Sequence, residues 1–286
     1  MKKLVSILCM CLICSSISAQ TYVAASSAYA GGDGSKANPY QIATAAQLAK
    51  FADDVNSGDN WSRGKYFVLT ADIVVNENLL ANPASTLEGQ KAGTLLKPIG
   101  TFANYDNYVP FMGVFDGQGH TISGMYQAIY EANEALFRAV ENAVVKNVHI
   151  RDAYIYGGKY CAGVVSFAVN STILNCSFEG EVKSWEWYGA GIAGQITGSS
   201  RIQNCYAKST VNAKSYLGGI VGIVGKESDG STGENPAIVE NCYSISSLTA
   251  TNGSVGMIAG RVNAAAVVRN CYYRTQATEV PIITNY

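Results

Sequence analysis

The chain has 286 residues, of which 48% are hydrophobic and 14% are charged, and it contains 29 glycines. This length is sufficient for a substantial core, while the few charges and many glycines favour β-structure over a compact helical domain. The formal net charge of −1 excludes a strongly basic protein. Because binding to polyanions relies on basic surfaces that release counterions, we expect no nucleic-acid or other polyanionic partner.

The first 19 residues have the layout of a secretory signal peptide. Lys2 and Lys3 precede an apolar run that extends to Cys14, and small residues lead to a cleavage site before Gln20. Ile13 stands where a lipoprotein signal needs a small residue, and no later apolar run is long enough to span a bilayer. We therefore expect an exported chain in the periplasm, on the outer surface or secreted, with no transmembrane segment in its mature part.

Beyond this segment the chain has five cysteines, an odd number that argues against a fully paired disulfide framework. None of them has the CxxC spacing of zinc and redox sites, so we expect no metal site and no cofactor. These residues are Cys161, Cys176, Cys205, Cys242 and Cys271.

The N-terminal part combines turn residues with one helix. Residues 31–35 are rich in glycine and lead into an extended segment over residues 38–42. Thr44 is placed to N-cap a helix that runs to about Asn56, with its apolar residues on one face. A single amphipathic helix before a β-array is expected to cap the open end of the array.

Two β-rich segments follow, separated by a surface excursion over residues 76–97. Residues 65–75 are rich in β-branched and aromatic side chains and predict a strand with a turn near Asp72. Residues 111–125 predict a strand, a tight turn and a second strand.

The second turn contains Asp116 and His120, which an enzyme could use as an acid–base pair. This pair lacks a nucleophile, a third orienting group and a metal constellation, so we do not assign catalysis to it. We interpret the segment as turn chemistry, in which Asp116 caps the turn while Gly117 and Gly119 supply unusual φ values.

The rest of the chain is a repeat array marked by asparagines that follow aliphatic runs. Their separations of 28, 29, 37 and 29 residues are typical of solenoids, propellers and arrays. The asparagines are Asn147, Asn175, Asn204, Asn241 and Asn270. The longest repeat holds an insertion over residues 225–236, which is either a solvated loop or part of a binding face.

The alternation of inward and outward side chains changes phase at each asparagine. Val145 and Val148 can both face inward only if the two-residue alternation of side chains is interrupted at Asn147. This interruption places Asn147 at a corner. Asparagine tolerates left-handed backbone angles, and its amide can hydrogen-bond to the copy one coil above. The sequence therefore predicts an asparagine ladder along one corner of stacked coils.

A second column is rich in glycine. Residues 160–166 align with residues 188–194, 216–222 and 254–260. Together with the downstream Asn-Cys-Tyr signature, this part of the chain resembles the GLUG repeat family, named for a Gly-Leu-variable-Gly core. Residues 34–126 look like the segment that often precedes such repeats in exported proteins of Bacteroides-like bacteria.

The resemblance implies an all-β fold, a right-handed parallel β-helix on a surface or secreted protein, with adhesion as the usual function. Met257 and Cys161 depart from the glycine-rich pattern, and Ser177 stands where later coils have tyrosine, so we expect irregular first and last repeats. The residues by themselves lead to a similar architecture, because stacked parallel strands let each coil hydrogen-bond to its neighbours over roughly six coils.

We accordingly divide the chain into four parts. They are a signal peptide (1–19), an N-terminal cap with the first coils (20–134), the GLUG-type coils (135–273) and a C-terminal tail that caps the other end (274–286).

The Asn-Cys-Tyr positions put cysteine and tyrosine on opposite faces of a strand. Stacked cysteines keep their Cβ atoms farther apart than the roughly 3.5–4.5 Å that a disulfide prefers, so we interpret them as inward thiols, with one or more bridges as the alternative. The tyrosines then form an outward stripe of Tyr206, Tyr243 and Tyr272. This stripe either holds sugar rings or only shields the sheet by stacking.

The densest aromatic spot of the sequence comprises Trp185, Trp187 and Tyr188. Large aromatic side chains with a polar atom are typical binding anchors, although they serve equally to cover a loop or a contact between protomers. Together with the three tyrosines of the stripe, these residues are our candidate ligand-binding residues.

An enzyme of this fold needs convergent carboxylates. Glu179 and Glu181 alternate on one strand, but the sequence shows no partner across a cleft at the roughly 5–9.5 Å that a glycosidase requires. We expect a non-catalytic adhesion or glycan-binding module whose partners are glycans or cell-surface proteins. The alternatives are a polysaccharide-active enzyme and a structural subunit of a surface assembly.

Overall fold

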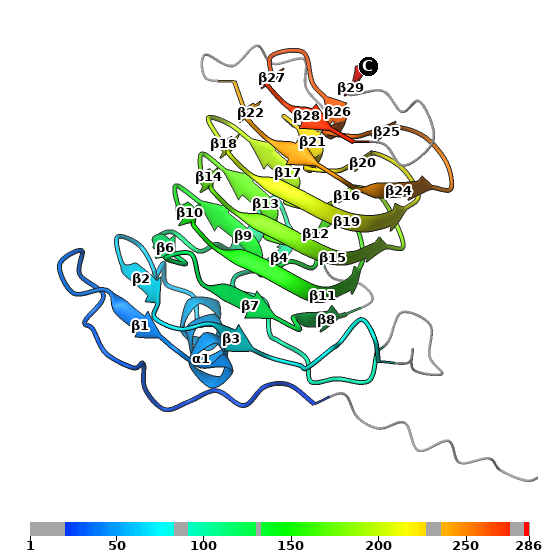
Figure 1. Ribbon diagram of the computed structural model, residues 1–286. Coiled ribbons are helices and arrows are strands. Elements are labelled where there is room, and N and C mark those ends of the chain that lie inside the picture. Colours follow the sequence, from blue (N-terminus) through cyan, green and yellow to red (C-terminus); the bar gives the residue numbers. More distant parts are fainter. Residues whose placement is uncertain (1–20, 83–90, 130–132, 227–235, 275–282, 286) are drawn as a thin grey trace, which may run out of the picture.

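The protein is a parallel β-solenoid of about seven turns with a single short helix near its N-terminus (Figure 1). The computed structural model describes residues 21–82, 91–129, 133–226, 236–274 and 283–285. The expected signal peptide lies outside this part, as do residues 227–235 of the insertion over residues 225–236 and most of the C-terminal tail. The all-β parallel architecture predicted from the sequence is confirmed.

Successive turns of the solenoid stack their strands into several parallel sheets. The eight-stranded sheet consists of β1 (Tyr40–Ile42), β2 (Tyr66–Leu69), β6 (Val114–Asp116), β10 (Val144–Lys146), β14 (Thr172–Leu174), β18 (Arg201–Gln203), β22 (Ile238–Glu240) and β27 (Val267–Arg269). The nine-stranded sheet consists of β3 (Ile73–Val74), β7 (Thr121–Ser123), β8 (Tyr126–Ala128), β11 (His149–Gly157), β15 (Ser177–Ser184), β19 (Tyr206–Ala213), β23 (Tyr243–Ser244), β24 (Ser247–Ala250) and β28 (Tyr272–Tyr273).

Two smaller parallel sheets and a hairpin complete the described part. The six-stranded sheet consists of β9 (Phe137–Glu141), β13 (Val165–Val169), β17 (Ala193–Thr197), β21 (Val221–Val224), β26 (Ala259–Val262) and β29 (Ile283–Asn285). The four-stranded sheet consists of β12 (Cys161–Ala162), β16 (Gly189–Ala190), β20 (Leu217–Gly218) and β25 (Val255–Gly256). The antiparallel hairpin is formed by β4 (Thr101–Asn104) and β5 (Asn107–Val109).

The helix α1 (Ala45–Asn56) lies at the N-terminal end of the solenoid, beside β1 and β3 (Figure 1). The Thr44 hydroxyl accepts a hydrogen bond from the Gln47 N–H at 3.2 Å, as the predicted N-cap requires. Phe51 is fully buried, and its ring centroid lies 4.3 Å from that of Phe67 in β2. The predicted helix and its bounds are confirmed. In the described residues no helix has the length and apolar character needed to cross a membrane.

The asparagines form the predicted corner ladder. All five have left-handed backbone angles, with φ between 51° and 55°. The side-chain amide of Asn175 donates to the Asn147 carbonyl oxygen at 3.0 Å, and that of Asn204 donates to Asn175 at 3.2 Å. The Asn147 amide in turn donates to an Asp116 carboxylate oxygen at 2.9 Å, which extends the ladder toward the N-terminus.

The cysteine column beside this corner is unpaired and inward. All five cysteines of the described residues are free, and among them only Cys271, in the last coil, is not fully buried. The Cys205 thiol donates to the Gln203 carbonyl at 3.2 Å, and Cys176 and Cys242 repeat this bond across the same corner. A thiol therefore suits this position as a small apolar group that also satisfies a carbonyl at the bend.

Two expectations for the N-terminal part are corrected. The excursion over residues 76–97 is not merely a surface loop, because Leu79 and Leu95 are buried against Tyr126 and Tyr154 on the outside of the nine-stranded sheet. The turn after β6 is a corner between two parallel sheets, since β6 and β7 belong to different sheets.

The chemistry of that corner differs in detail from the expectation. Asp116 accepts from the Gln118 N–H at 2.9 Å and thus caps the turn as predicted, while His120 pairs with Asp72 at 3.2 Å. Gln118 and Gly119 have positive φ, but Gly117 does not. Gly117 is required for another reason, because a Cβ there would lie 2.4 Å from the Asn147 carbonyl oxygen.

Candidate functional site

Three tyrosines lie on the outside of the six-stranded sheet and form a stack along the solenoid axis. The ring centroids of Tyr160 and Tyr188 are 4.9 Å apart, and those of Tyr188 and Tyr216 are 5.2 Å apart. Tyr188 and Tyr216 have φ near 60°, which is uncommon for a bulky residue. Gly260, in the next coil, leaves room for the Tyr216 backbone, because a Cβ at Gly260 would lie 2.4 Å from the Tyr216 carbonyl carbon. We call these residues the tyrosine stack.

The hairpin β4–β5 is fastened beside this stack. The hydroxyl of Tyr105, at the hairpin tip, lies 2.8 Å from the Tyr160 hydroxyl and donates to the Gln195 side-chain oxygen at 2.9 Å. The Phe102 ring lies 4.8 Å from that of Phe167 in β13. The hairpin therefore covers part of the sheet and leaves a hollow on either side of Tyr105.

The larger of these hollows has a volume of about 520 Å³ and combines aromatic, amide and charged side chains. It is lined by Phe102, Ala103, Asn104, Tyr105, Asn133, Gly158, Lys159, Tyr160, Trp185 and Glu186. We call it the Trp185 hollow. A concave site with apolar rings and a few convergent polar groups is the usual form of a small-ligand site.

The second hollow, of about 420 Å³, lies on the other side of Tyr105. Its lining includes Tyr108, whose hydroxyl donates to a Glu141 carboxylate oxygen at 2.8 Å. Burial and this neighbouring carboxylate raise the pKa of Tyr108 to about 12. Tyr108 is therefore a neutral hydrogen-bonding group at physiological pH.

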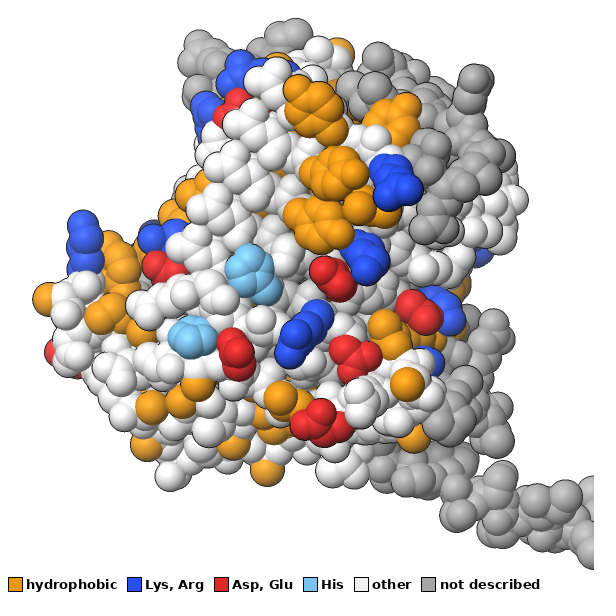
Figure 2. Space-filling model, in the orientation of Figure 1, with side chains coloured by type: hydrophobic (Ala, Val, Ile, Leu, Met, Phe, Trp, Pro, Cys, Tyr) orange, Lys and Arg blue, Asp and Glu red, His pale blue; other side chains and the backbone are white. Residues whose placement is uncertain are grey.

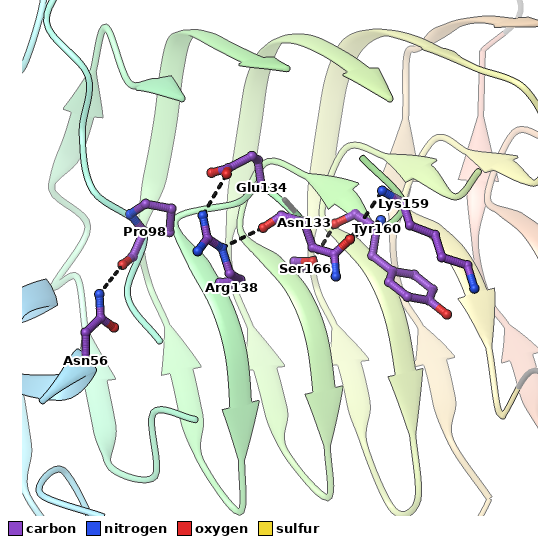
Figure 3. A network of polar contacts seen from close by, with 8 residues as sticks. All are labelled: Asn56, Pro98, Asn133, Glu134, Arg138, Lys159, Tyr160 and Ser166. Carbon is purple, nitrogen blue, oxygen red and sulfur yellow. Dashed lines mark hydrogen bonds and ion pairs between the residues drawn. The ribbon is translucent and has the colours of Figure 1, made fainter. Parts of the chain in front are cut away.

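A polar network supports the wall of the Trp185 hollow (Figure 3). The Asn133 side-chain oxygen accepts from the backbone N–H groups of Lys159 and Tyr160 at 3.2 and 3.1 Å. Arg138 donates to the Asn133 backbone carbonyl at 2.8 Å and to a Glu134 carboxylate oxygen at 2.7 Å. Since Asn133 and Lys159 both line the hollow, this network fixes the position of its wall.

Glu134 is completely buried behind that wall. Burial raises the pKa of its carboxyl group to about 7, although the adjacent Arg138 favours the charged form. Burial also raises the pKa of the neighbouring Cys161 thiol to about 12. Cys161 is therefore a neutral thiol, whereas Glu134 changes charge near neutral pH.

The predicted tyrosine stripe lies on a different face, on the outside of the nine-stranded sheet. Figure 2 shows a column of hydrophobic side chains over β19, β23 and β28, which carry Tyr206, Tyr243 and Tyr272. The Tyr206 and Tyr243 rings are stacked with centroids 5.9 Å apart, and Tyr272 is 70% exposed. Because stacked rings face each other, the stripe presents mostly ring edges to solvent.

The structure thus separates the six candidate residues into two groups. Trp185 lines the hollow, whereas Trp187 is 43% exposed and stacks on Tyr216 at 5.9 Å. Tyr188 is only 2% exposed and lies inside the tyrosine stack, so it does not offer its ring to a ligand. The stripe has no part in the hollow.

Sequence reasoning missed the residues that the hairpin brings to the hollow. Phe102, Asn104 and Tyr105 belong to no repeat, and their partners Asn133 and Lys159 are distant in sequence. The signal that could have found them is the density of aromatic residues over residues 102–108, next to an Asn-Tyr-Asp-Asn turn.

The carboxylates considered for catalysis lie elsewhere. Glu179 and Glu181 line a third hollow, of about 390 Å³, on the nine-stranded sheet, and Asp152 is a further carboxylate in its lining. The Asp152 carboxylate accepts hydrogen bonds from the backbone N–H groups of Leu79 and Leu80. A Glu179 carboxylate oxygen lies 4.0 Å from the Lys208 ammonium nitrogen. Within the described part of the chain, no three His, Cys, Asp or Glu side chains are grouped so that they could hold a metal ion.

The chain is similar to parts of much longer proteins. It is 29% identical over 239 residues to the immunoglobulin A1 protease of Streptococcus sanguinis, a match that covers 74% of this chain and 12% of that protein. It is 33% identical over 132 residues to an Evansella cellulosilytica protein provisionally named as a Gly-rich membrane protein, covering 46% and 13% of the two chains. The chain therefore spans about an eighth of the length of these curated relatives.

The fold is similar to the crystal structure of a Bacteroides ovatus protein that is provisionally named immunoglobulin A1 protease. The TM-score is 0.62 at 21% identity, and the match covers 86% of this chain and 70% of the other. This likeness shows a shared β-solenoid fold. No protein-family model matches the chain, so its relation to the GLUG repeats rests on the sequence resemblance alone.

These comparisons correct the expectation that the protein is not an enzyme. The streptococcal relative and the Bacteroides structure both carry the name of a protease, so proteins that share this sequence pattern and this fold are named as enzymes. The sequence argument relied on the missing pair of glycosidase carboxylates, which bears on sugar hydrolysis and not on proteolysis.

Proposed function

We propose that this β-solenoid is a carbohydrate-binding region of an exported surface protein, and that sugars bind in the Trp185 hollow. The observation that carries the proposal is the lining of the hollow, which combines aromatic rings with side-chain amides from segments that are distant in sequence. The rings are those of Phe102, Tyr105 and Trp185, and the amides are those of Asn104 and Asn133.

This lining matches the chemistry of a sugar. A sugar ring has apolar C–H faces and polar edges, so it packs on aromatic rings while amide groups hydrogen-bond to its hydroxyls. The hollow is also supported by the Asn133 network, so it is formed before a ligand arrives, and preorganisation reduces the entropy cost of binding.

Export is part of the same proposal. The arrangement of Lys2, Lys3 and the following apolar run supports a signal peptide, and surface glycans are accessible only to an exported protein.

Titration calorimetry of the purified protein with a panel of oligosaccharides tests the proposal. We expect Trp185→Ala to weaken sugar binding at least about fivefold, because a buried aromatic contact typically contributes about 1 kcal/mol or more to the binding free energy. Trp185→Phe should restore part of the affinity.

Tyr272→Ala is the matched control, because this exposed ring lies on the nine-stranded sheet, away from the hollow. Thermal unfolding curves of all variants must coincide with that of the wild type. Equal losses for Trp185→Ala and Tyr272→Ala, or no binding to any sugar, would refute the proposal.

A second candidate function is proteolysis, which the names of the streptococcal and Bacteroides proteins favour. Incubation of the purified chain with immunoglobulin A1, followed by electrophoresis, tests it directly. Discrete heavy-chain fragments would establish proteolysis. Intact immunoglobulin after long incubation would refute proteolysis of immunoglobulin A1 by this chain.

A further inference from the structure

The second hollow, beside Tyr108, is walled by aromatic rings, and we call it the Tyr108 hollow. The Tyr105 and Phe167 ring centroids are 5.3 Å apart with an angle of 72° between the rings, and those of Tyr108 and Phe167 are 6.0 Å apart with an angle of 86°. Both tyrosine rings therefore stand steeply on Phe167, which is buried. Tyr105 is 45% exposed and Tyr108 is partly exposed, so these two rings are the accessible walls of the hollow.

Several outer rings of this protein hold one of its own cations against their faces, but the Tyr108 ring does not. The Lys65 ammonium lies 3.7 Å from the Trp61 ring centroid, and the Lys214 ammonium lies 5.3 Å from that of Trp185. The faces of aromatic rings are electrostatically negative and attract cations. Within the described part of the chain, no lysine or arginine lies over the ring of Tyr108.

The charged groups at this hollow are mainly acidic. Asp106 belongs to its lining, and the Asp106 backbone N–H donates to the Asn104 side-chain oxygen at 3.0 Å, which fixes the hairpin tip. Glu141 accepts the hydrogen bond of the Tyr108 hydroxyl at 2.8 Å, and this bond makes the phenol ring richer in electrons. Lys226 is the basic residue of the lining. Two carboxylates against one ammonium group favour a cationic ligand over an anionic one.

The hydrogen-bonding groups of the walls favour a cation that has no N–H groups. The Tyr108 hydroxyl donates to Glu141, the Tyr105 hydroxyl donates to Gln195 at 2.9 Å, and Val169 adds aliphatic surface to the lining. A primary ammonium ion has three N–H groups that each require an acceptor. A quaternary ammonium group has none, and its methyl groups pack on ring faces, which is how aromatic cages recognise such ligands.

We infer that the Tyr108 hollow binds a quaternary ammonium group, of the kind that choline carries, against the rings of Tyr105 and Tyr108 with Asp106 as its counter-ion. The volume of about 420 Å³ lies within the range of small-molecule sites. The Tyr108 hollow and the Trp185 hollow lie on opposite sides of Tyr105, so this inference does not depend on carbohydrate binding.

Three small probes test the inference by titration of the purified protein, followed by saturation-transfer NMR. Choline carries the quaternary ammonium group. Neopentyl carbinol is its neutral isostere, in which carbon replaces nitrogen, and ethanolamine carries a primary ammonium group instead. We expect choline to bind about tenfold or more tightly than either of the other two probes.

Variants then assign the binding to residues. Tyr108→Leu removes one aromatic wall and should weaken choline binding at least about fivefold, while Asp106→Asn should weaken it about two- to fivefold. Tyr108→Phe keeps the ring but loses the bond to Glu141, so it should weaken binding less than leucine does. Tyr272→Leu, which replaces an exposed ring on the nine-stranded sheet, is the control and should leave choline binding unchanged.

Melting curves verify that each variant is folded. Should Tyr108→Leu unfold, Asp106→Asn carries the assignment, because Asp106 is exposed at the hairpin tip. Equal binding of choline and neopentyl carbinol would overturn the inference, since the hollow would then select shape and not charge. Absence of choline binding, or an equal loss in Tyr272→Leu, would overturn it as well. None of these results bears on sugar binding in the Trp185 hollow.

Discussion

The tyrosine stack and the tyrosine stripe both recur coil by coil, but the fold treats them in opposite ways. In the stack, Tyr160 and Tyr188 are each 2% exposed, held under the hairpin with left-handed φ at Tyr188. In the stripe, the rings project from the nine-stranded sheet, and Tyr272 at the end is 70% exposed. A repeated residue therefore has a repeated position, but its role depends on what covers it.

The difference has a physical origin. The stripe stands on a strand, where alternate side chains must point away from the core. The stack instead lies in the bends before β12, β16 and β20, where positive φ at Tyr188 and Tyr216 turns these two rings across the outer face of the six-stranded sheet. The hairpin then closes over that face and creates the hollow beside it.

The largest predicted difference in the free energy of unfolding is between replacing a ring of the tyrosine stack and replacing a ring of the tyrosine stripe. We expect Tyr188→Ala to lower the free energy of unfolding by about 3–5 kcal/mol, because it leaves a cavity between two stacked rings. Tyr243→Ala should cost about 1 kcal/mol or less, as for an outward pair on a sheet. Urea unfolding measures both, and similar losses would contradict the distinction between stack and stripe.

The pH dependence of the free energy of unfolding tests the buried region behind the wall of the Trp185 hollow. The folded pKa of Glu134 is raised from 4.5 to about 7, so the folded state binds more protons than the unfolded state between these values. Stability should therefore fall as pH rises through this window, by on the order of 3 kcal/mol, and become level above it. Urea midpoints measured from pH 4.5 to 8 check this.

Glu134→Gln removes the ionisable group and should flatten the pH dependence in that window. Glu181→Gln is the matched control, since this carboxylate is on the outward face and pairs with Lys183 at 3.4 Å. A slope that survives in Glu134→Gln would assign the pH dependence to other groups.

The corner that precedes the stripe gives a smaller predicted effect than Tyr188 of the stack or Glu134. Asn204 has φ of 53° and donates to Asn175, so Asn204→Ala should cost about 1–2 kcal/mol through backbone strain and a lost hydrogen bond. Asn204→Gly keeps the backbone accessible and should cost less. Thermal unfolding compares the two. Both variants lose the ladder bond, so a loss for glycine as large as that for alanine would contradict the contribution of backbone strain.

Particular residues show how far the sequence could go. Asn147 and the asparagines at equivalent positions identified the corners, because asparagine tolerates left-handed backbone angles and the alternation of inward and outward side chains shifts there. Thr44 identified the start of the helix, because its side chain can N-cap a helix. The prediction for Gly117 was wrong in mechanism, because its closest neighbour belongs to the next coil. Tyr188 was named as a candidate ligand-binding residue, and its sequence gives no sign of its burial, which depends on stacking with Tyr160 and Tyr216.

The sequence by itself therefore determined the parallel solenoid, its period, its asparagine corners and its inward thiols, since these follow from local backbone preferences repeated in register. Only the tertiary structure decided which aromatic rings are accessible. The Trp185 hollow depends on the hairpin at residues 101–109 reaching across to Asn133, Lys159 and Trp185, and contacts between such distant segments have no period that a sequence could display.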